Sequence, residues 1–241
     1  MISIIIPVYN ERLRIPRTLE KVTEFVKKNE LVSEVIFVDD GSTDDTATLI
    51  EAAVSQNPFI KIIRQTRNTG KGAAIKKGVL SARACDHILY TDTDLSTPLE
   101  ELTRLLARME NADVVIGSRY MNDSTLDIGL SHKRHLVSTV FNVIRRLILL
   151  PSIHDSQCGF KIFTYTAAQQ IFPLQTLSGF AFDMELLVIA NEQHMAIKEI
   201  GVTWTDDNQG KLRVIPTSLQ MLRDMIKIRS NVFFGKYRNS K

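Results

Sequence analysis

The stretch HILYTDTDLSTP, residues 87–98, is an apolar run that ends in two aspartates separated by one residue. Because side chains alternate faces along a strand, Asp92 and Asp94 point to one side and Thr93 to the other. Two neighbouring carboxylates repel each other unless a divalent cation lies between or beside them. The stretch therefore predicts either a Mg²⁺ or Mn²⁺ site, or a strand followed by an Asp-rich turn in which Ser96 or Thr97 caps the next helix.

Strand and helix patterns alternate on both sides of this stretch. Short apolar runs rich in β-branched residues have the pattern of strands buried on both faces, at 2–8, 34–40, 59–65, 86–92 and 112–118. Helical patterns lie between them, at 16–29, 43–56, 70–84 and 98–110. This alternation predicts an α/β fold, with a Rossmann-like, mostly parallel central sheet and helices on both faces. Such sheets bind ligands at the carboxyl ends of their strands.

The second half of the chain has a less regular pattern. Candidate strands cover 158–164 and 197–204, and candidate helices cover 132–150, 182–194 and 216–234. Because no repeat, low-complexity tract or linker divides the sequence, we expect a single domain over residues 1–241.

Composition narrows the class of protein. The net charge of +3 is too small to indicate nucleic-acid binding. From Lys211 to the end, however, eight Lys and Arg stand against one acid, Asp224. This basic tail suits an anionic membrane surface or ligand, or else a solvated helix face. Two cysteines without metal-type spacing favour a reduced compartment, and no apolar run reaches the roughly 20 residues of a membrane span. We therefore expect a cytoplasmic or peripheral protein.

The segment VIFVDDGSTDDT, residues 35–46, predicts a strand followed by an acidic turn and a helix start. Gly41 permits a tight turn, and Ser42 with Asp45 fits a capping box. Asp39 and Asp40 lie at the strand tip, where a carboxylate can accept a hydrogen bond from a ribose hydroxyl or a base NH. Turn chemistry alone is the alternative.

The segment RNTGKGAAIKKG, residues 67–78, is a Gly-rich loop that opens a helix. Backbone NH groups at a helix start favour an anion, and Lys71 adds a point charge. The segment is not a P-loop, and the first strand lacks G-x-G-x-x-G. An ordinary strand-to-helix connection is the alternative reading.

Eight segments occur in an order that resembles a known family: IIIPVYNE, VDDGSTDDT, RNTGKGAA, TDTDLSTP, GSRY, DSQCGFKIF, GFAFDMELL and GKLRV. Together they resemble the family 2 inverting glycosyltransferases with the GT-A fold. Within that family they are most similar to the group that glycosylates polyprenyl phosphates, the dolichyl-phosphate β-glucosyltransferases. The resemblance covers about residues 2–215.

The resemblance implies roles for the candidate residues near the nucleotide. Pro7, Tyr9 and Glu11 would border the base of a nucleotide-sugar, and Asp39 or Asp40 would hold the base or ribose. The nucleotide-sugar half would be about 1–120, and the acceptor and membrane-facing half about 121–241.

The resemblance also implies roles at the reacting centre. Asp92 would contact the ribose or sugar and, with Asp94, the metal. Arg119 would meet the phosphate or the acceptor, and Lys211 would neutralise the pyrophosphate. Asp183 would be a base or an organiser of the acceptor site, while helix capping is its purely structural alternative.

The implied reaction is a metal-dependent inverting transfer of a hexose from a nucleotide-sugar to a polyprenyl phosphate, dolichyl or undecaprenyl. It would take place at the cytoplasmic face of a membrane. Ser96, Thr205 and the tripeptide Gly210-Lys211-Leu212 depart from the mannosyl pattern, so UDP-glucose is favoured over GDP-mannose as donor. The alternatives are transfer to a glycan hydroxyl and a non-catalytic nucleotide-sugar-binding scaffold.

Two segments have the pattern of interfacial helices. Residues 132–151 combine an apolar stripe with His132, Arg145 and Arg146, and residues 218–238 have the same character. A core-facing helix explains the apolar stripe of residues 132–151 equally well. The resemblance favours the membrane, since a polyprenyl-phosphate acceptor lies there.

Overall fold

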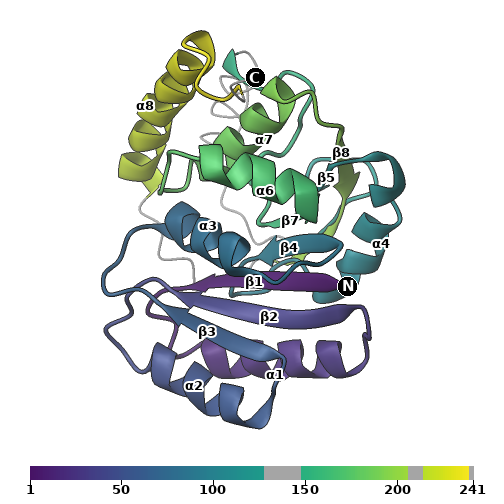
Figure 1. Cartoon of the computed structure of the whole chain (residues 1–241), viewed down its shortest axis with the longest axis vertical. Helices are drawn as coiled ribbons and strands as arrows, with labels where there is room; N and C mark the ends of the chain where they lie inside the picture. Colours follow the sequence, from purple (N-terminus) through teal and green to yellow (C-terminus); the bar gives the residue numbers. More distant parts are fainter. Residues whose placement is uncertain (128–147, 206–213, 239–241) are drawn as a thin grey trace.

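The computed structural model describes residues 1–127, 148–205 and 214–238 (Figure 1). A seven-stranded sheet forms its centre, in the order β3-β2-β1-β4-β7-β5-β8. Its strands are β1 (Ile2–Val8), β2 (Val32–Asp39), β3 (Ile60–Arg64), β4 (His87–Thr91), β5 (Val114–Ser118), β7 (Phe160–Thr164) and β8 (Ile197–Gly201). A second, two-stranded sheet pairs β6 (Thr125–Asp127) with β9 (Thr203–Thr205).

The sheet is mostly parallel, as predicted. Neighbouring strands run parallel except β7, which pairs antiparallel with β4 on one side and with β5 on the other. The carboxyl ends of β1, β2, β4 and β5 consequently share one edge, and the start of the reversed strand β7 lies at that edge too. The predicted strand over 197–204 is divided between the two sheets, at Val202.

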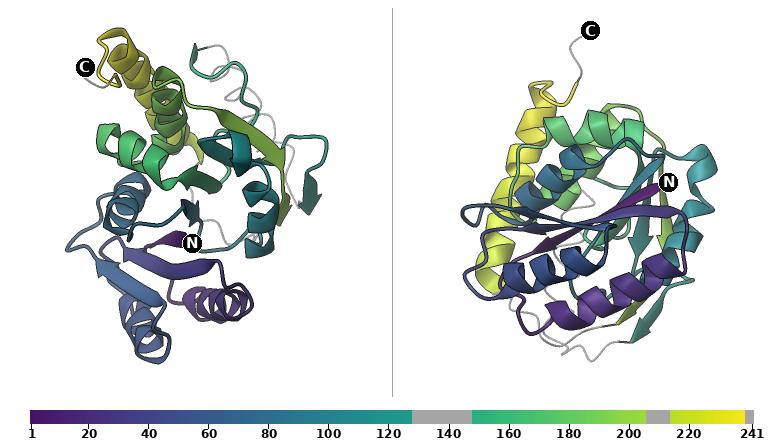
Figure 2. Two further views of the ribbon diagram at one scale, coloured as in Figure 1. Left: turned by 45° about the vertical axis from the view of Figure 1, so that its right-hand side comes forward. Right: turned by 60° about the horizontal axis from the view of Figure 1, so that its bottom comes forward.

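Helices cover both faces of the sheet, as predicted (Figure 2). They are α1 (Ile15–Lys27), α2 (Thr46–Gln56), α3 (Lys71–Ser81), α4 (Leu102–Leu106), α6 (Tyr165–Leu174), α7 (Phe182–Glu192) and α8 (Val214–Phe233). Helices α1, α2 and α4 pack into one apolar layer, and α3, α6, α7 and α8 into the other. Within β1, Ile5 faces the second layer, whereas Ile4 and Ile6 face the first.

The predicted helix over 98–110 is broken into three short pieces. A 3₁₀ turn at Leu99–Glu101 precedes α4, and another at Met109–Asn111 follows it. The buried leucines at 99, 102 and 105 are three residues apart, which matches a 3₁₀ turn better than an α-helix.

Several expectations fall outside the described residues. They are Lys211, most of the candidate helix over 132–151 and, within it, Arg145 and Arg146. Among the described residues, no helix has both the length and the apolar character needed to cross a bilayer. The single-domain assignment and its division near residue 120 remain predictions.

Candidate active site

A cavity of about 710 Å³ lies at the shared carboxyl edge of the parallel strands. Its lining includes most of the residues predicted from the sequence: Pro7, Tyr9, Glu11, Asp40, Lys71, Asp92, Asp94, Arg119 and Asp183. They follow four different strands or begin helices, so the sheet order brings them together. Asp39 is buried and is not among the lining residues.

The carboxylates of Asp92 and Asp94 follow β4 and line the cavity together. Burial and the neighbouring Asp92 charge raise the pKa of Asp94 above its ordinary value. Asp94 Oδ1 accepts a 3.0 Å hydrogen bond from the Ser96 NH. Leu95, which follows Asp94, has a left-handed backbone (φ +49°), a conformation that is costly for a leucine. The chain thus turns sharply at the second carboxylate.

Lys71, the first residue of α3, places its ammonium in this acidic region. Its Nζ lies 2.5 Å from Asp92 Oδ1. This contact is an ion pair without hydrogen-bond geometry, and Asp92 Oδ1 is buried with no hydrogen-bond donor. Burial opposes the Lys71 charge, but the carboxylates of Asp92 and Asp183 outweigh burial and raise the lysine pKa. Lys71 therefore stays charged in the cavity.

Gly159 makes room for Asp92. A β-carbon at Gly159 would lie 2.1 Å from Asp92 Oδ2, well inside van der Waals contact. This proximity follows from the reversed strand β7, because Phe160 pairs with Thr91 at the end of β4. A glycine is thus required at this position for Asp92 to keep its place.

Asp183 lies in the first turn of α7 and belongs to a buried polar cluster at the cavity wall. Its Oδ1 accepts a 2.6 Å hydrogen bond from Lys161 Nζ and another from the Tyr90 hydroxyl. Lys161 is fully buried and also donates to the Cys158 carbonyl at 2.6 Å. The helix-capping alternative for Asp183 is wrong, because Ala181 is the N-cap and no side chain caps α7.

Arg119 follows β5 and is held by Asp155. Its Nε and Nη2 donate to the two carboxylate oxygens at 2.7 and 3.0 Å, a bidentate pair. Burial opposes both charges, but the attraction to Arg119 lowers the pKa of Asp155. Glu199 on β8 accepts the backbone NH groups of His154 and Asp155 at 2.8 and 2.7 Å. The guanidinium therefore has a fixed orientation at the cavity.

Asp40 holds the loop that precedes α3. Its Oδ1 accepts from Gln65 Nε2 and from both the NH and the hydroxyl of Thr69, each at 2.8 Å. Its Oδ2 accepts from the Gly70 NH at 2.8 Å. Both oxygens therefore have loop partners, although Asp40 also lines the cavity. Its contact with a base or ribose remains a prediction.

The start of α3 offers fewer free amides than the Gly-rich loop predicted. The Gly72 and Ala73 NH groups donate to the Ser178 carbonyl, at 2.7 and 3.3 Å. With the Gly70 NH on Asp40, most of these amides have partners within the protein. The structural reading fits the backbone of this loop, whereas the Lys71 side chain supplies the positive charge.

The predicted capping devices are wrong. Ser42 Oγ accepts from the Asn10 NH at 2.9 Å, and Asp45 makes no capping hydrogen bond at the start of α2. Neither Ser96 nor Thr97 caps the turn at Leu99. The Asp39 carboxylate accepts from the Ser42 NH at 3.1 Å and so stabilises the turn, while its predicted nucleotide contact stays untested. Tertiary partners have taken these side chains away from their local roles.

Some cavity residues have no strong signal in the sequence. Arg14, at the start of α1, pairs with Glu11 at 2.6 Å. Phe180, Trp204 and Met221 also line the cavity, from three separate parts of the chain. Only Gln157 lay within a quoted segment, DSQCGFKIF.

Comparison with known proteins gives this site its class. The family model described as Glycosyl transferase family 2 matches residues 3–172. The chain belongs to this family and is a glycosyltransferase.

Its relatives narrow the likeness to one kind of enzyme. Dolichyl-phosphate beta-glucosyltransferase of Dictyostelium discoideum is 34% identical over 247 residues, covering 97% of this chain and 75% of the relative. The Saccharomyces cerevisiae and Homo sapiens proteins of the same name are each 31% identical. They cover 100% and 98% of this chain, and 77% of their own length. The chain is thus a glycosyltransferase similar to dolichyl-phosphate β-glucosyltransferases.

Solved structures show the same fold. Glucosyl-3-phosphoglycerate synthase from Mycobacterium tuberculosis, in complex with Mn²⁺, UDP-glucose and phosphoglyceric acid, matches with a TM-score of 0.71 and 19% identity. Its complex with Mn²⁺, UDP and glucosyl-3-phosphoglycerate matches with a TM-score of 0.69 and 18% identity. Each match covers 95% of this chain and 80% of the other. This likeness establishes the GT-A fold predicted from the sequence.

The close approach of Gly159 to Asp92 yields a first prediction. Gly159→Ala is expected to lower glycosyl transfer by about ten- to a hundredfold, because the new methyl group displaces a carboxylate at the reacting centre. Steady-state rates and thermal unfolding curves of the purified variant measure the effect. Gly179→Ala is the matched control, since its β-carbon would meet only Gln220, at 3.5 Å. A fully active Gly159→Ala enzyme would show that Asp92 needs no fixed position.

Proposed function

We propose that the chain transfers glucose from UDP-glucose to a polyprenyl phosphate, dolichyl or undecaprenyl, with inversion at the anomeric carbon. The transfer takes place on the cytoplasmic face of a membrane and depends on Mg²⁺ or Mn²⁺. The observation that carries this proposal is the pair Asp92 and Asp94 beside Lys71 in a cavity at the carboxyl edge of a GT-A sheet. The names of the relatives support the donor sugar and acceptor, and the M. tuberculosis complexes support UDP-glucose and a metal.

The carboxylate pair fits a divalent cation. Asp92 Oδ1 is buried without a hydrogen-bond donor, and Asp94 lies beside it in a low-dielectric site. No group of three or more His, Cys, Asp and Glu forms a metal cluster in the parts of the chain that the structure describes. Asp94 and Asp92 would hold the ion, leaving positions for phosphate oxygens and water. The bound ion would stabilise negative charge on the leaving nucleoside diphosphate.

The positive side chains suit two phosphate groups. Lys71 lies beside the carboxylates and Arg119 has a fixed orientation at the cavity. In this proposal Lys71 and Lys211 neutralise the diphosphate of the donor, and Arg119 meets the phosphate of the acceptor. Residues 1–120 then bind the nucleotide-sugar, and residues 121–241 bind the acceptor.

Asp183 favours a phosphate acceptor over a hydroxyl acceptor. A hydroxyl needs a base to take its proton, whereas a phosphate is already an anion at neutral pH. If Asp183 accepted a proton, the fully buried Lys161 would lose its carboxylate partner, which is costly. We therefore assign Asp183 to the organisation of the acceptor site.

The proposed step is a single in-line displacement. A phosphate oxygen of the acceptor attacks the anomeric carbon opposite the leaving UDP. The bond from this carbon to the acceptor forms as its bond to UDP breaks, and the electron pair leaves with UDP. An α-linked donor thus gives a β-linked product.

A substrate panel tests the proposal directly. The purified full chain is incubated with UDP-glucose or GDP-mannose, Mg²⁺ or Mn²⁺, and a short polyprenyl phosphate in detergent. We expect transfer of glucose to the lipid and a β-linked product by NMR. An α-linked product would reject inversion. Tight UDP-glucose binding without transfer to any acceptor would instead indicate a scaffold.

Asp183→Asn separates the two acceptor classes. The variant is expected to keep measurable transfer to polyprenyl phosphate, because Asn can still accept from Tyr90 and Lys161 and no base is needed. Transfer rates are compared with circular dichroism and UDP binding of the same protein. Complete loss of transfer, in a variant that folds and binds UDP, would point to a general base and a hydroxyl acceptor.

A further inference from the structure

The far end of α8 exposes an unusual amount of apolar surface. Phe233, Phe234 and Ile226 are 83%, 69% and 68% exposed, and the two phenylalanine rings lie edge to face at 5.3 Å. The opposite side of the same helix is buried in the core through Met225 and Ile228. The exposed side chains are therefore not needed for folding, and such a cluster indicates an interaction site.

Basic side chains surround this apolar cluster. Arg223, Lys227, Arg229 and Lys236 are all exposed, and the one nearby acid, Asp224, is half-buried. Within the described residues, none of the four forms an ion pair. We call the three apolar and four basic side chains the α8 patch. Exposed aromatic and aliphatic groups among unpaired cations are typical of surfaces that enter the headgroup region of anionic membranes.

The α8 patch is rigidly joined to the active-site cavity. Tyr237, just beyond α8, is fully buried and donates to Glu185 Oε1 at 2.7 Å. Glu185 lies two residues after Asp183 on α7. At the other end of the described helix, Met221 lines the cavity. Twelve residues of helix separate Met221 from Phe233, a distance of about 18 Å.

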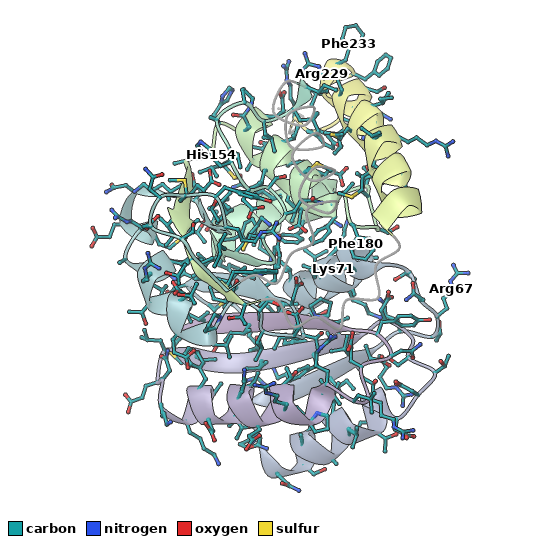
Figure 3. All side chains as sticks on the ribbon, turned by 180° about the vertical axis from the view of Figure 1, so that it is seen from behind. Arg67, Lys71, His154, Phe180, Arg229 and Phe233 are labelled. Carbon is teal, nitrogen blue, oxygen red and sulfur yellow. The ribbon has the colours of Figure 1, made fainter. Side chains whose placement is uncertain are left out.

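Figure 3 shows this arrangement, with Phe180 and Lys71 near the first end of α8 and Phe233 at the last. Phe180 is 41% exposed and, with Met221, gives the cavity an apolar side next to α8. A lipid chain that leaves a bilayer along α8 would reach the cavity at this apolar side.

We propose that the α8 patch docks the enzyme on an anionic bilayer, with α8 leading from the membrane to the acceptor side of the cavity. The choice of a lipid surface rests on the proposed function. Charge complementarity supports it independently, because all the exposed charges of the patch are positive. A second copy of the chain fits less well, since a two-fold contact would place like charges opposite each other.

Vesicle co-sedimentation of the full chain tests this docking. Vesicles of phosphatidylcholine alone are compared with vesicles that also contain phosphatidylglycerol. We expect preferential binding to the anionic vesicles. Phe233→Ser with Phe234→Ser should weaken that binding about tenfold or more, and Arg229→Glu with Lys236→Glu should do the same and reduce its salt dependence.

Matched controls come from exposed residues far from α8. Leu31→Ser with Leu80→Ser removes apolar surface that is 52% and 42% exposed, and Lys27→Glu with Lys28→Glu reverses two exposed charges. Both control variants should bind anionic vesicles like the wild type. Equal losses in the control and patch variants would overturn the proposal.

An activity assay in detergent separates this inference from the proposed function. With UDP-glucose and a short, dispersed polyprenyl phosphate, the phenylalanine variant should transfer glucose within about twofold of the wild type, because docking is bypassed. Wild-type transfer combined with unchanged vesicle binding of both patch variants would overturn docking alone. Loss of vesicle binding in a chain that transfers no glucose would support docking and reject the function. A dimer that dissociates in the phenylalanine variant, without vesicle binding, would assign the α8 patch to a second copy.

Discussion

Asp94→Asn is expected to cut glucosyl transfer by about a hundredfold or more while the fold stays intact. The change keeps the shape of the side chain but removes one of the two charges at the end of β4. In the proposed reaction, negative charge grows on the leaving diphosphate, so a weaker cation site acts mainly on the transition state. Turnover with saturating UDP-glucose and Mg²⁺ or Mn²⁺ measures the loss.

A binding measurement accompanies the rates. Wild-type protein should show a rise in melting temperature with UDP that depends on added metal, because a ligand that binds the native state stabilises it. The Asp94→Asn variant should lose the metal-dependent part of this shift. Asp45→Asn is the matched control, since Asp45 is exposed at the start of α2 and does not line the cavity.

Two results would contradict the metal role of Asp94. One is normal turnover of Asp94→Asn. The other is full activity of the wild type in excess chelator.

The buried pair of Asp183 and Lys161 leads to the largest expected effect on stability. Asp183→Leu is expected to lower the free energy of unfolding by about 3–5 kcal/mol, because it leaves a buried ammonium without its carboxylate. Lys161 would keep only the Cys158 carbonyl and the face of the Tyr90 ring, whose centroid lies 5.4 Å away. Urea unfolding followed by circular dichroism measures the change.

The double variant Lys161→Met with Asp183→Leu completes the test. Replacing both charges with apolar groups removes the uncompensated ammonium, so the double variant should be more stable than Asp183→Leu alone. Glu51→Gln is the surface control, since the exposed pair of Glu51 and Arg64 at 3.1 Å should contribute at most about 1 kcal/mol. Simple additivity of the two single losses would show that the charges are not coupled.

The sequence alone determined the architecture of the first half of the chain. Strands β1 and β5 are buried along their whole length, and their uninterrupted apolar runs predict this burial. Residues that follow β1, β2, β4 and β5 meet at one edge because parallel strands share a direction. The pairing of Asp92 with Asp94 was also predictable, since it depends only on alternation within one strand.

Only the tertiary structure decided which partners these side chains have. Lys71 lies beside Asp92, Lys161 beside Asp183 and Asp155 beside Arg119, although 21 or more residues separate each pair. These contacts depend on the sheet order, above all on the insertion of the reversed strand β7 between β4 and β5. Local hydrophobic periodicity reports which residues are buried but carries no record of strand order.

The same limit explains the wrong local predictions. Ser42 and Asp45 fitted a capping box, yet the Ser42 hydroxyl accepts from the Asn10 NH in a neighbouring loop. Asp40 has the position of a nucleotide ligand, yet its oxygens hold the loop before α3. A short polar side chain pairs with whichever donor the fold brings nearest. Sequence therefore determined where the polar groups of this site gather, and packing between distant segments decided which of them point into the cavity.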